Sequence, residues 1–294
     1  MCTRENTAYI NPDGGRPIFG WEGVKRGLPI IKLPCGKCPE CMKDYYTNWA
    51  TRGSRELMRW ERNAFITLTY KNECVPKDGS LRKKHVQDFI KRVKKHFRST
   101  KANPIRQTYC GEYGTKDGRP HYHVILYNCQ FKDQYYWRTS ETGYKIFRSP
   151  TLETLWTFGN SEFGEAEPGS VAYIYKYILK KKSRKEKKKP LKAYWHGKPV
   201  LIEHEFVESS RNPGIGAHMR GTNSVKKGYL TVNGVKQKLP KYYLEDLKKK
   251  DPSSYEQIKD ARFDHAQKKP VETELRKKQK ENVQKRLTDT KKTL

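Results

Sequence analysis

The sequence contains no long hydrophobic run, and its first residues include no stretch resembling the apolar core of a secretory signal peptide. The sequence therefore predicts a soluble protein that works in the cytosol. It also contains no Gly-x-x-x-x-Gly-Lys-Ser/Thr motif, the phosphate-binding loop of many NTPases. We therefore do not expect this chain to drive a motor reaction of its own through such a loop.

Acidic residues are scarce relative to basic ones, with 32 Asp and Glu against 62 Lys and Arg, for a formal net charge of +30. An excess of this size predicts a polyanionic partner. Nineteen tyrosines and six tryptophans are interleaved with the positive charge. Cations follow phosphates and aromatic rings stack on exposed bases, so we expect single-stranded nucleic acid rather than a membrane surface.

The seven cysteines are an odd number and follow no secretory signal, which predicts reduced thiols rather than a disulfide framework. Three of them, Cys35, Cys38 and Cys41, form a Cys-x-x-Cys-x-x-Cys cluster ahead of a basic helix expected over about residues 39–62. Three thiols at this spacing can bind zinc, with Cys2, Cys74 or a histidine as the fourth ligand. The alternative is three reduced thiols at a turn and helix start.

The most informative stretch is residues 119–127, whose run of Val, Ile, Leu and Tyr after a Gly-containing turn predicts a β-strand. Side chains alternate along a strand, so His121 and His123 point to one face and Tyr122 to the other. Two imidazoles placed in this way can bind one metal ion. The alternative is a surface strand that carries two histidines.

The segment before this turn, residues 105–113, also has the composition of a strand and can pair with it as an antiparallel hairpin. In that pairing Glu112 lies roughly opposite His121, and its carboxylate becomes a third ligand, because cross-strand Cβ atoms are only about 4.5–5.5 Å apart. Two histidines and one carboxylate suit Zn²⁺ well and Mg²⁺ or Mn²⁺ less well. The spacing alone does not name the metal.

The order of the predicted elements indicates an α+β fold. A strand is expected over residues 64–70 and an amphipathic helix over 81–97, before the hairpin of 105–127. This order favours an antiparallel sheet flanked by helices. We expect an N-terminal arm with the cysteine cluster and basic helix over 1–62, a core over 63–239, and a charged helical or disordered tail over 240–294.

A second informative stretch follows Ser170, which can cap a helix. Tyr173 and Tyr177 are four residues apart, hence on one helical face, and Lys176 and Lys180 repeat the spacing. The alternative is an amphipathic helix whose tyrosines pack on the sheet.

The sequence next contains a basic run over residues 180–189, which we expect to hold nucleic acid electrostatically. A glycine-bearing loop over 205–216 contains Arg211 and could approach a backbone phosphate. The expected DNA-binding residues are Lys181, Lys182, Arg184, Lys185 and Arg211.

Three motifs occur in a fixed order: Phe65-Ile-Thr-Leu-Thr-Tyr70, then His121-Tyr-His123, then Tyr173-x-x-x-Tyr177-Ile-Leu-Lys180. This order resembles the HUH superfamily of rolling-circle replication initiators. The paired tyrosines, the cysteine cluster and the loop Ser210-Arg-Asn-Pro-Gly-Ile-Gly216 are most similar to the replication initiators of gokushovirus-type microviruses, which are small single-stranded DNA phages. The resemblance covers about residues 30–216.

The resemblance implies a five-stranded antiparallel sheet and a metal-dependent endonuclease that nicks and rejoins single-stranded or supercoiled origin DNA in the host cytoplasm. Tyr173 and Tyr177 would attack a phosphodiester in turn and form a 5′-phosphotyrosine link, with Lys180 and Lys176 stabilising the developing charge. Mg²⁺ or Mn²⁺ on His121, His123 and Glu112 would polarise the phosphate, and zinc would be structural. A host helicase and a host DNA polymerase would be the partners.

Two groups of alternatives stay open at this point. A two-tyrosine plasmid relaxase or a single-strand transposase would use the same chemistry on another substrate. A non-catalytic zinc-containing protein that binds single-stranded nucleic acid would explain the charge, the cysteines and the aromatics, but it would leave His121, His123 and the repeated tyrosines without a role.

Overall fold

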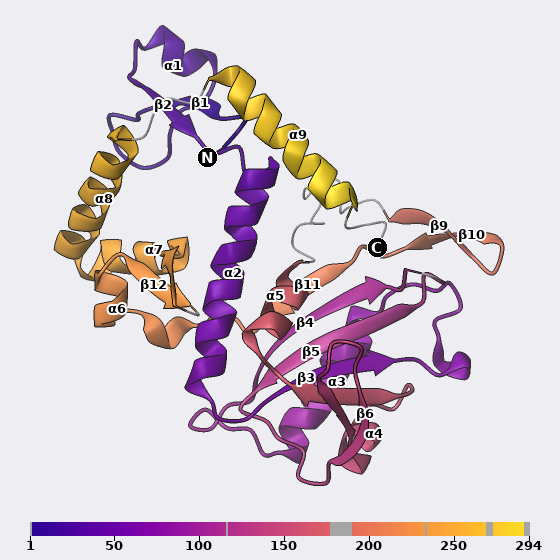
Figure 1. Cartoon of the computed structure of the whole chain (residues 1–294). Helices are drawn as coiled ribbons and strands as arrows, with labels where there is room; N and C mark the ends of the chain where they lie inside the picture. Colours follow the sequence, from indigo (N-terminus) through magenta and orange to yellow (C-terminus); the bar gives the residue numbers. More distant parts are fainter. Residues whose placement is uncertain (1, 116, 177–189, 233, 269–272, 291–294) are drawn as a thin grey trace. The chain divides into compact units, whose positions relative to one another are not determined.

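The computed structural model describes residues 2–115, 117–176, 190–232, 234–268 and 273–290 (Figure 1). The chain divides into two compact units, one formed by residues 1–47 with 257–294 and the other by residues 48–256. The second unit contains the histidines, Glu112 and Tyr173. Among the described helices, none combines the length and the apolar character that a membrane crossing requires.

The centre of the second unit is a seven-stranded antiparallel sheet with the order β11-β4-β5-β3-β8-β7-β6. The α+β class and the antiparallel sheet are therefore confirmed, whereas the expected number of about five strands is too small. The strands are β3 (Asn63–Thr69), β4 (Arg106–Tyr113), β5 (Pro120–Tyr127), β6 (Tyr135–Thr139), β7 (Lys145–Arg148), β8 (Ser161–Glu165) and β11 (Phe206–Ser209).

The sheet is larger than expected because the strands at its two ends have weak sequence signals. All five residues of β6 are exposed, so that strand has no alternation of buried and exposed positions. Strand β7 meets β8 through the single pair Phe147 and Phe163. Strand β11 has only four residues and returns from a distant part of the chain to pair with β4.

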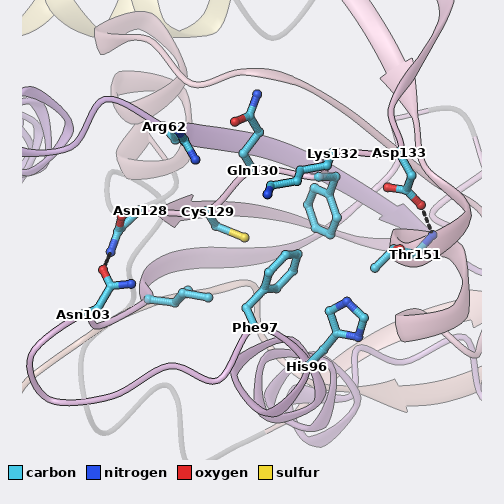
Figure 2. Close-up of a pocket in the computed structure, with 12 residues that line it drawn as sticks. Arg62, His96, Phe97, Asn103, Asn128, Cys129, Gln130, Lys132, Asp133 and Thr151 are labelled. Atoms are coloured by element: carbon cyan, nitrogen blue, oxygen red, sulfur yellow. Dashed lines mark hydrogen bonds between the residues drawn. The ribbon is translucent and has the colours of Figure 1, made fainter.

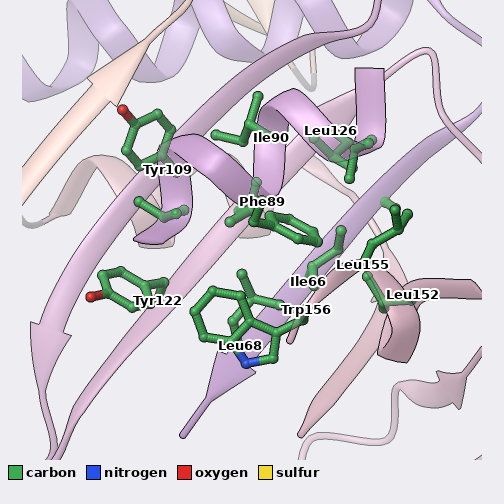
Figure 3. Close-up of a cluster of buried hydrophobic side chains, with 14 of the residues drawn as sticks. Ile66, Leu68, Phe89, Ile90, Tyr109, Tyr122, Leu126, Leu152, Leu155 and Trp156 are labelled. Atoms are coloured by element: carbon green, nitrogen blue, oxygen red, sulfur yellow. The ribbon is translucent and has the colours of Figure 1, made fainter. Parts of the chain in front are cut away.

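One face of the sheet carries the main hydrophobic core beneath α3 (Lys83–His96) and α4 (Pro150–Leu155) (Figure 3). Along β3, Ala64, Ile66 and Leu68 are buried at alternate positions, which is the period-2 pattern expected of a half-covered strand. Phe89 of α3 and Trp156 after α4 pack edge to face above these residues, with ring centroids 5.9 Å apart. This core fixes β3 and β5 side by side.

The opposite face carries α5 (Pro168–Lys176) and, within this unit, the second half of α2 (Pro39–Arg59). Trp49 of α2 stacks on Tyr175 of α5 with centroids 5.5 Å apart. The two helices approach closely at Gly53, where a Cβ atom would lie 2.5 Å from a methyl group of Val171. Glycine at this position therefore lets α5 lie against the sheet.

Shorter elements complete the second unit. Two hairpins, β9 (Leu191–Trp195) with β10 (Lys198–Ile202) and β12 (Tyr229–Val232) with β13 (Val235–Lys238), form separate two-stranded sheets. The unit also contains η1 (Asn72–Cys74), η4 (Ala217–Met219), α6 (Asn223–Lys226) and α7 (Lys241–Lys250).

The first unit contains the two-stranded sheet of β1 (Asn6–Tyr9) and β2 (Ile30–Leu33), the short helix α1 (Trp21–Lys25) and the beginning of α2. Helix α9 (Glu274–Thr290) belongs to the same unit, and α8 (Pro252–Gln267) runs across the boundary between the two units. Residues 240–268 and 273–290 are thus largely helical, in agreement with the helical character expected for the charged C-terminal segment.

Candidate functional site

The candidate site lies on the face of the sheet that carries α5, and three strands and that helix contribute to it. In the β4–β5 hairpin, Glu112 is directly opposite His121, as the sequence predicted. His123 lies two residues further along the same face of β5, opposite Thr67 of β3. The strand period of two and the hairpin register therefore bring one carboxylate and two imidazoles together.

The three ligand candidates meet at one oxygen atom. Oε1 of Glu112 lies 2.8 Å from Nε2 of His121 and 2.6 Å from Nε2 of His123. The carboxylate and His123 are buried, and His121 is half-buried. One ligand atom from each residue lies within 4.8 Å of the others, close enough to bind a common divalent cation.

The other ring nitrogen of each histidine is held by a neighbour. Nδ1 of His121 donates to the Arg119 carbonyl at 3.2 Å, and Nδ1 of His123 lies 3.2 Å from the hydroxyl of Thr67. Such partners orient a metal-binding imidazole and fix which nitrogen faces the ion. Both Nε2 atoms are thus turned to the carboxylate. The donor set and its supports fit a divalent cation.

The tyrosine nearest to this cluster is Tyr173, on α5. Its hydroxyl donates to Oε1 of Glu112 at 3.0 Å. Its ring meets that of His123 edge to face at a centroid distance of 5.1 Å, and Phe65 stacks on the other side of His123 at 5.5 Å. Tyr173 is 39% exposed, so the hydroxyl lies at the edge of the cluster rather than inside the core.

The electrostatics of the cluster are dominated by the buried carboxylate. Burial opposes ionisation of Glu112, but hydrogen bonds from His121 and His123 outweigh it and lower the pKa of Glu112 to about 2. Burial lowers the pKa of His121, and the hydrogen bond and negative charge of Glu112 raise it by more. Burial and then the charge of Glu112 raise the pKa of Tyr173. Without a cation, Tyr173 is therefore a neutral phenol.

The neighbouring Tyr175 has a different environment. It is 1% exposed, and its hydroxyl bonds to Thr108 at 3.2 Å and Ser209 at 3.0 Å. This residue packs the helix onto the sheet, and the alternative of structural tyrosines thus describes Tyr175 but not Tyr173. Lys176 is exposed at the end of α5.

Several expected site residues lie outside the described part of the chain. They are Tyr177, Lys180, Lys181, Lys182, Arg184 and Lys185.

Arg211 is described and exposed, and its guanidinium pairs with Glu208 at 2.7 Å. The glycine-bearing loop that follows is engaged by protein groups. The Gly216 amide donates to the Glu56 carboxylate at 2.7 Å, and the Gly216 carbonyl accepts from Tyr243 at 2.9 Å. The expectation that this loop approaches a phosphate is therefore not met at Gly216, because a buried carboxylate takes the place of the anion.

Sequence reasoning missed Thr67 and Phe65 as supports of His123. The signal was present in the strand motif itself, since residues 65, 67 and 69 share one face of β3 and residues 64, 66 and 68 share the other. The second set forms the core, which leaves the first set facing the histidines of the neighbouring strand.

A separate pocket lies away from the triad, at the ends of β5 and α3 (Figure 2). Phe97 and Cys129 form its apolar wall, and Asn103 and Asn128 are hydrogen-bonded beside it at 2.6 Å. At its edge, Asp133 accepts from the Thr151 amide at 2.7 Å at the beginning of α4. The carboxylate is thus used to cap a helix, and the described pocket contains no group of metal ligands.

The fold and the site define a class: an antiparallel α+β protein in which a helix presents a tyrosine to a two-histidine, one-carboxylate cluster. Comparison with known proteins is consistent with this class. Residues 63–182 match a family model of replication-associated proteins, described by its ORF2 members. These residues include β3, the β4–β5 hairpin and α5.

The chain is also similar to two curated phage proteins over most of its length. It is 29% identical over 287 residues to replication-associated protein VP4 of Bdellovibrio phage phiMH2K, covering 95% of this chain and 86% of the relative. It is 29% identical over 252 residues to replication-associated protein ORF2 of Spiroplasma virus 4, covering 80% and 72%. No solved structure matches the chain. The chain belongs with the replication-associated proteins of phages, and the resemblance inferred from its motifs is confirmed at that level.

Proposed function

We propose that this protein is a site-specific, single-stranded DNA endonuclease and strand-joining enzyme that initiates rolling-circle replication of a phage genome. The single observation that carries the proposal is the meeting of Tyr173, His121 and His123 at one oxygen of Glu112, at 3.0, 2.8 and 2.6 Å. A nucleophile and a metal-binding cluster at such distances are what phosphodiester transesterification by tyrosine requires.

In this reaction the Tyr173 oxygen attacks the scissile phosphorus, and the bond from phosphorus to the 3′ oxygen breaks. The 5′ phosphate stays on the tyrosine, and the 3′ oxygen takes a proton and leaves as a free hydroxyl. Oε1 of Glu112 already accepts the hydrogen bond of the phenol, which gives the departing proton an acceptor. In the reverse reaction a 3′-hydroxyl attacks the phosphotyrosine and restores a phosphodiester, so nicking and joining use the same groups.

A divalent cation held by Glu112, His121 and His123 would supply Lewis-acid polarisation of the scissile phosphate when bound. Mg²⁺ and Mn²⁺ are the proposed ions. Two imidazoles favour Mn²⁺ of these two, because Mg²⁺ prefers oxygen ligands. The raised pKa of Tyr173 is the reason that the phenol needs a nearby positive charge to react.

Tyr177 is the proposed second nucleophile, which would cut the regenerated origin while Tyr173 holds the first 5′ end. Lys176 and Lys180 would stabilise the developing negative charge. The basic residues Lys181, Lys182, Arg184, Lys185 and Arg211 would hold the DNA through its phosphates. A host helicase and a host polymerase would unwind and extend the strand in the host cytoplasm.

A plasmid relaxase or a single-strand transposase would share this chemistry, but the relatives reported above are named replication-associated proteins, which favours the initiator. The test is an adduct assay with single-stranded DNA from the protein's own replicon and Mn²⁺. An SDS-resistant protein–DNA adduct is expected for the wild type, and it should disappear in the Tyr173→Phe, Tyr177→Phe double variant.

The single variants assign the roles of the two tyrosines. Loss of the first cleavage in Tyr173→Phe alone would make Tyr173 the primary nucleophile, and loss in Tyr177→Phe alone would reverse the order. Tight, salt-sensitive binding without any adduct would replace the proposal by a non-catalytic single-strand-binding protein.

A further inference from the structure

A second cluster of metal-ligating side chains lies in the first unit, apart from the residues used for the proposed nicking reaction. The thiols of Cys2, Cys35, Cys38 and Cys41 all lie within 4.8 Å of one another. All four are free cysteines. Of the fourth ligands considered from the sequence, Cys2 is the one that joins the three clustered thiols in the described residues.

The spacing of the sulfur atoms matches a shared metal ion rather than a covalent bond. Sγ of Cys2 and Sγ of Cys38 are 3.8 Å apart. A disulfide bond holds its sulfur atoms at about 2.05 Å. In a tetrahedral zinc site, Zn–S bonds of about 2.3 Å place neighbouring sulfur atoms about 3.8 Å apart. The observed distance is the one that zinc would impose.

Backbone amides point at two of these sulfur atoms. The Cys35 amide donates to Sγ of Cys2 at 3.3 Å, and the amides of Lys37 and Cys38 donate to Sγ of Cys35 at 3.4 and 3.2 Å. The turn that aims them passes through Gly36, which has a φ of +71°. Amide donors favour the thiolate form of cysteine, which is the form that binds metal.

We propose that Cys2, Cys35, Cys38 and Cys41 bind one structural Zn²⁺ ion as four thiolates. Four protein ligands complete a tetrahedron and leave no position for substrate, which is the arrangement of structural rather than catalytic zinc. Thiolates select zinc over Mg²⁺ and Mn²⁺. The chain thus separates two metals by ligand chemistry, with sulfur in this cluster and oxygen and nitrogen at Glu112, His121 and His123.

The ion would stabilise a region with few other means of support. Cys2 precedes β1, and Cys35 follows β2, so the ion closes the segment that contains this two-stranded sheet onto the start of α2. An isolated two-stranded sheet is marginally stable in water. Few side chains of residues 2–47 are buried, and two of those are Cys2 and Cys38. Metal binding therefore replaces the hydrophobic core that this arm lacks.

The test measures zinc in full-length protein purified under reducing conditions without added metal. About one zinc per chain is expected for the wild type, and a loss of most of it for Cys2→Ser and for Cys38→Ser. Cys74→Ser is the matched control, because it removes a free, half-buried thiol outside the cluster, and it should keep the zinc. The double variant His121→Ala, His123→Ala should also keep it, which separates this site from the proposed catalytic one.

Cobalt substitution identifies the ligands. The Co²⁺ form of the wild type should show thiolate-to-cobalt charge-transfer bands and the intense visible bands of a tetrahedral site. Cys2→His should retain a metal ion, since histidine also binds zinc, but with a spectrum shifted to three sulfurs and one nitrogen. This variant keeps the test decisive if Cys2→Ser fails to fold.

Wild-type protein without zinc and without cobalt–thiolate bands would overturn the proposal. An unchanged zinc content in Cys2→Ser would also overturn it, since Cys2 would then not be a ligand. Both results are independent of the adduct assay, so the zinc site and the nicking activity can fail separately.

Discussion

The hydroxyl of Tyr173 donates a hydrogen bond of 3.0 Å to Oε1 of Glu112, the same oxygen that both site histidines approach. A helix residue and a hairpin residue that are 61 positions apart in the chain are therefore in direct contact. The contact places the only described tyrosine hydroxyl of α5 that reaches the cluster, and most of the predictions below depend on it.

Removing the hydroxyl of Tyr173 should have a different effect from removing that of its neighbour Tyr175. Tyr173→Phe should lower covalent adduct formation at least ~100-fold if Tyr173 is the nucleophile of the first cut, since phenylalanine cannot attack phosphorus. Tyr175→Phe loses buried hydrogen bonds to Thr108 and Ser209 and should cost about 1 kcal/mol of stability while retaining the adduct. Adduct yield and denaturant unfolding measure the two effects, and equal adduct loss in both variants would argue against a special role for Tyr173.

Glu112→Gln should abolish Mn²⁺-dependent cleavage because it replaces the charged ligand by a neutral one of the same shape. DNA binding should remain within a few-fold of wild type, since the variant leaves the basic surface unchanged. Cleavage and filter binding at several salt concentrations check this. A parallel loss of DNA binding would assign Glu112 a structural role instead.

Thr67→Val should weaken metal binding about 10- to 100-fold, because Nδ1 of His123 loses its hydroxyl partner while the side-chain shape is kept. Thr69→Val is the matched control on the same face of β3, since the Thr69 hydroxyl bonds to the Asn160 carbonyl. The measurement is the Mn²⁺ concentration that gives half-maximal adduct. The same concentration for both variants would contradict the role of Thr67.

Gly53→Ala should destabilise the protein by about 1–3 kcal/mol, because the new methyl group would lie 2.5 Å from Val171. The substitution should also lower adduct yield by displacing α5 and with it Tyr173. Gly169→Ala, on α5 itself, meets nothing within 4 Å and should leave stability unchanged or slightly higher. Partial rescue of Gly53→Ala by Val171→Ala would locate the clash, and absence of any destabilisation would contradict it.

Stability should decrease as the pH is lowered from 7 to 5. Burial and the nearby Arg82 lower the pKa of His85, and burial lowers that of His218. The unfolded chain then binds more protons than the folded one near and below the ordinary histidine pKa of about 6.5, so protonation favours unfolding.

The check is the free energy of unfolding at pH 5, 6 and 7 for the wild type and His85→Gln. The variant should show a shallower decrease, since one of the two histidines no longer titrates. His96→Gln is the control, and its slope should equal that of the wild type. A steeper decrease in His85→Gln would reverse the sign assigned here.

Much of the site could be predicted from the sequence because it depends on local geometry. The positions of His121 and His123 on one face follow from the strand period, and Glu112 follows from the short turn that joins the two strands. The contact of Tyr173 with Glu112 could not be predicted in this way. It depends on how α5 packs, which is decided by Gly53, Val171 and Trp49.

The extent of the sheet was underestimated for a related reason. Strand β11 pairs with β4 only after the chain has passed through the long segment between residues 165 and 206, and four residues are too few to show a pattern. The glycine-bearing loop was misread because glycines fit an anion of any kind, and a buried carboxylate, Glu56, occupies that role.

The sequence separations within the site divide it into two transferable parts. Glu112 is 9 residues from His121 and 11 from His123, whereas Tyr173 is 61 residues from Glu112. The ligands therefore travel together as one hairpin, and the nucleophile arrives on an independent segment. Recombination could exchange one part while keeping the other, which would let a lineage change how many tyrosines it uses without rebuilding the place where the phosphate is held.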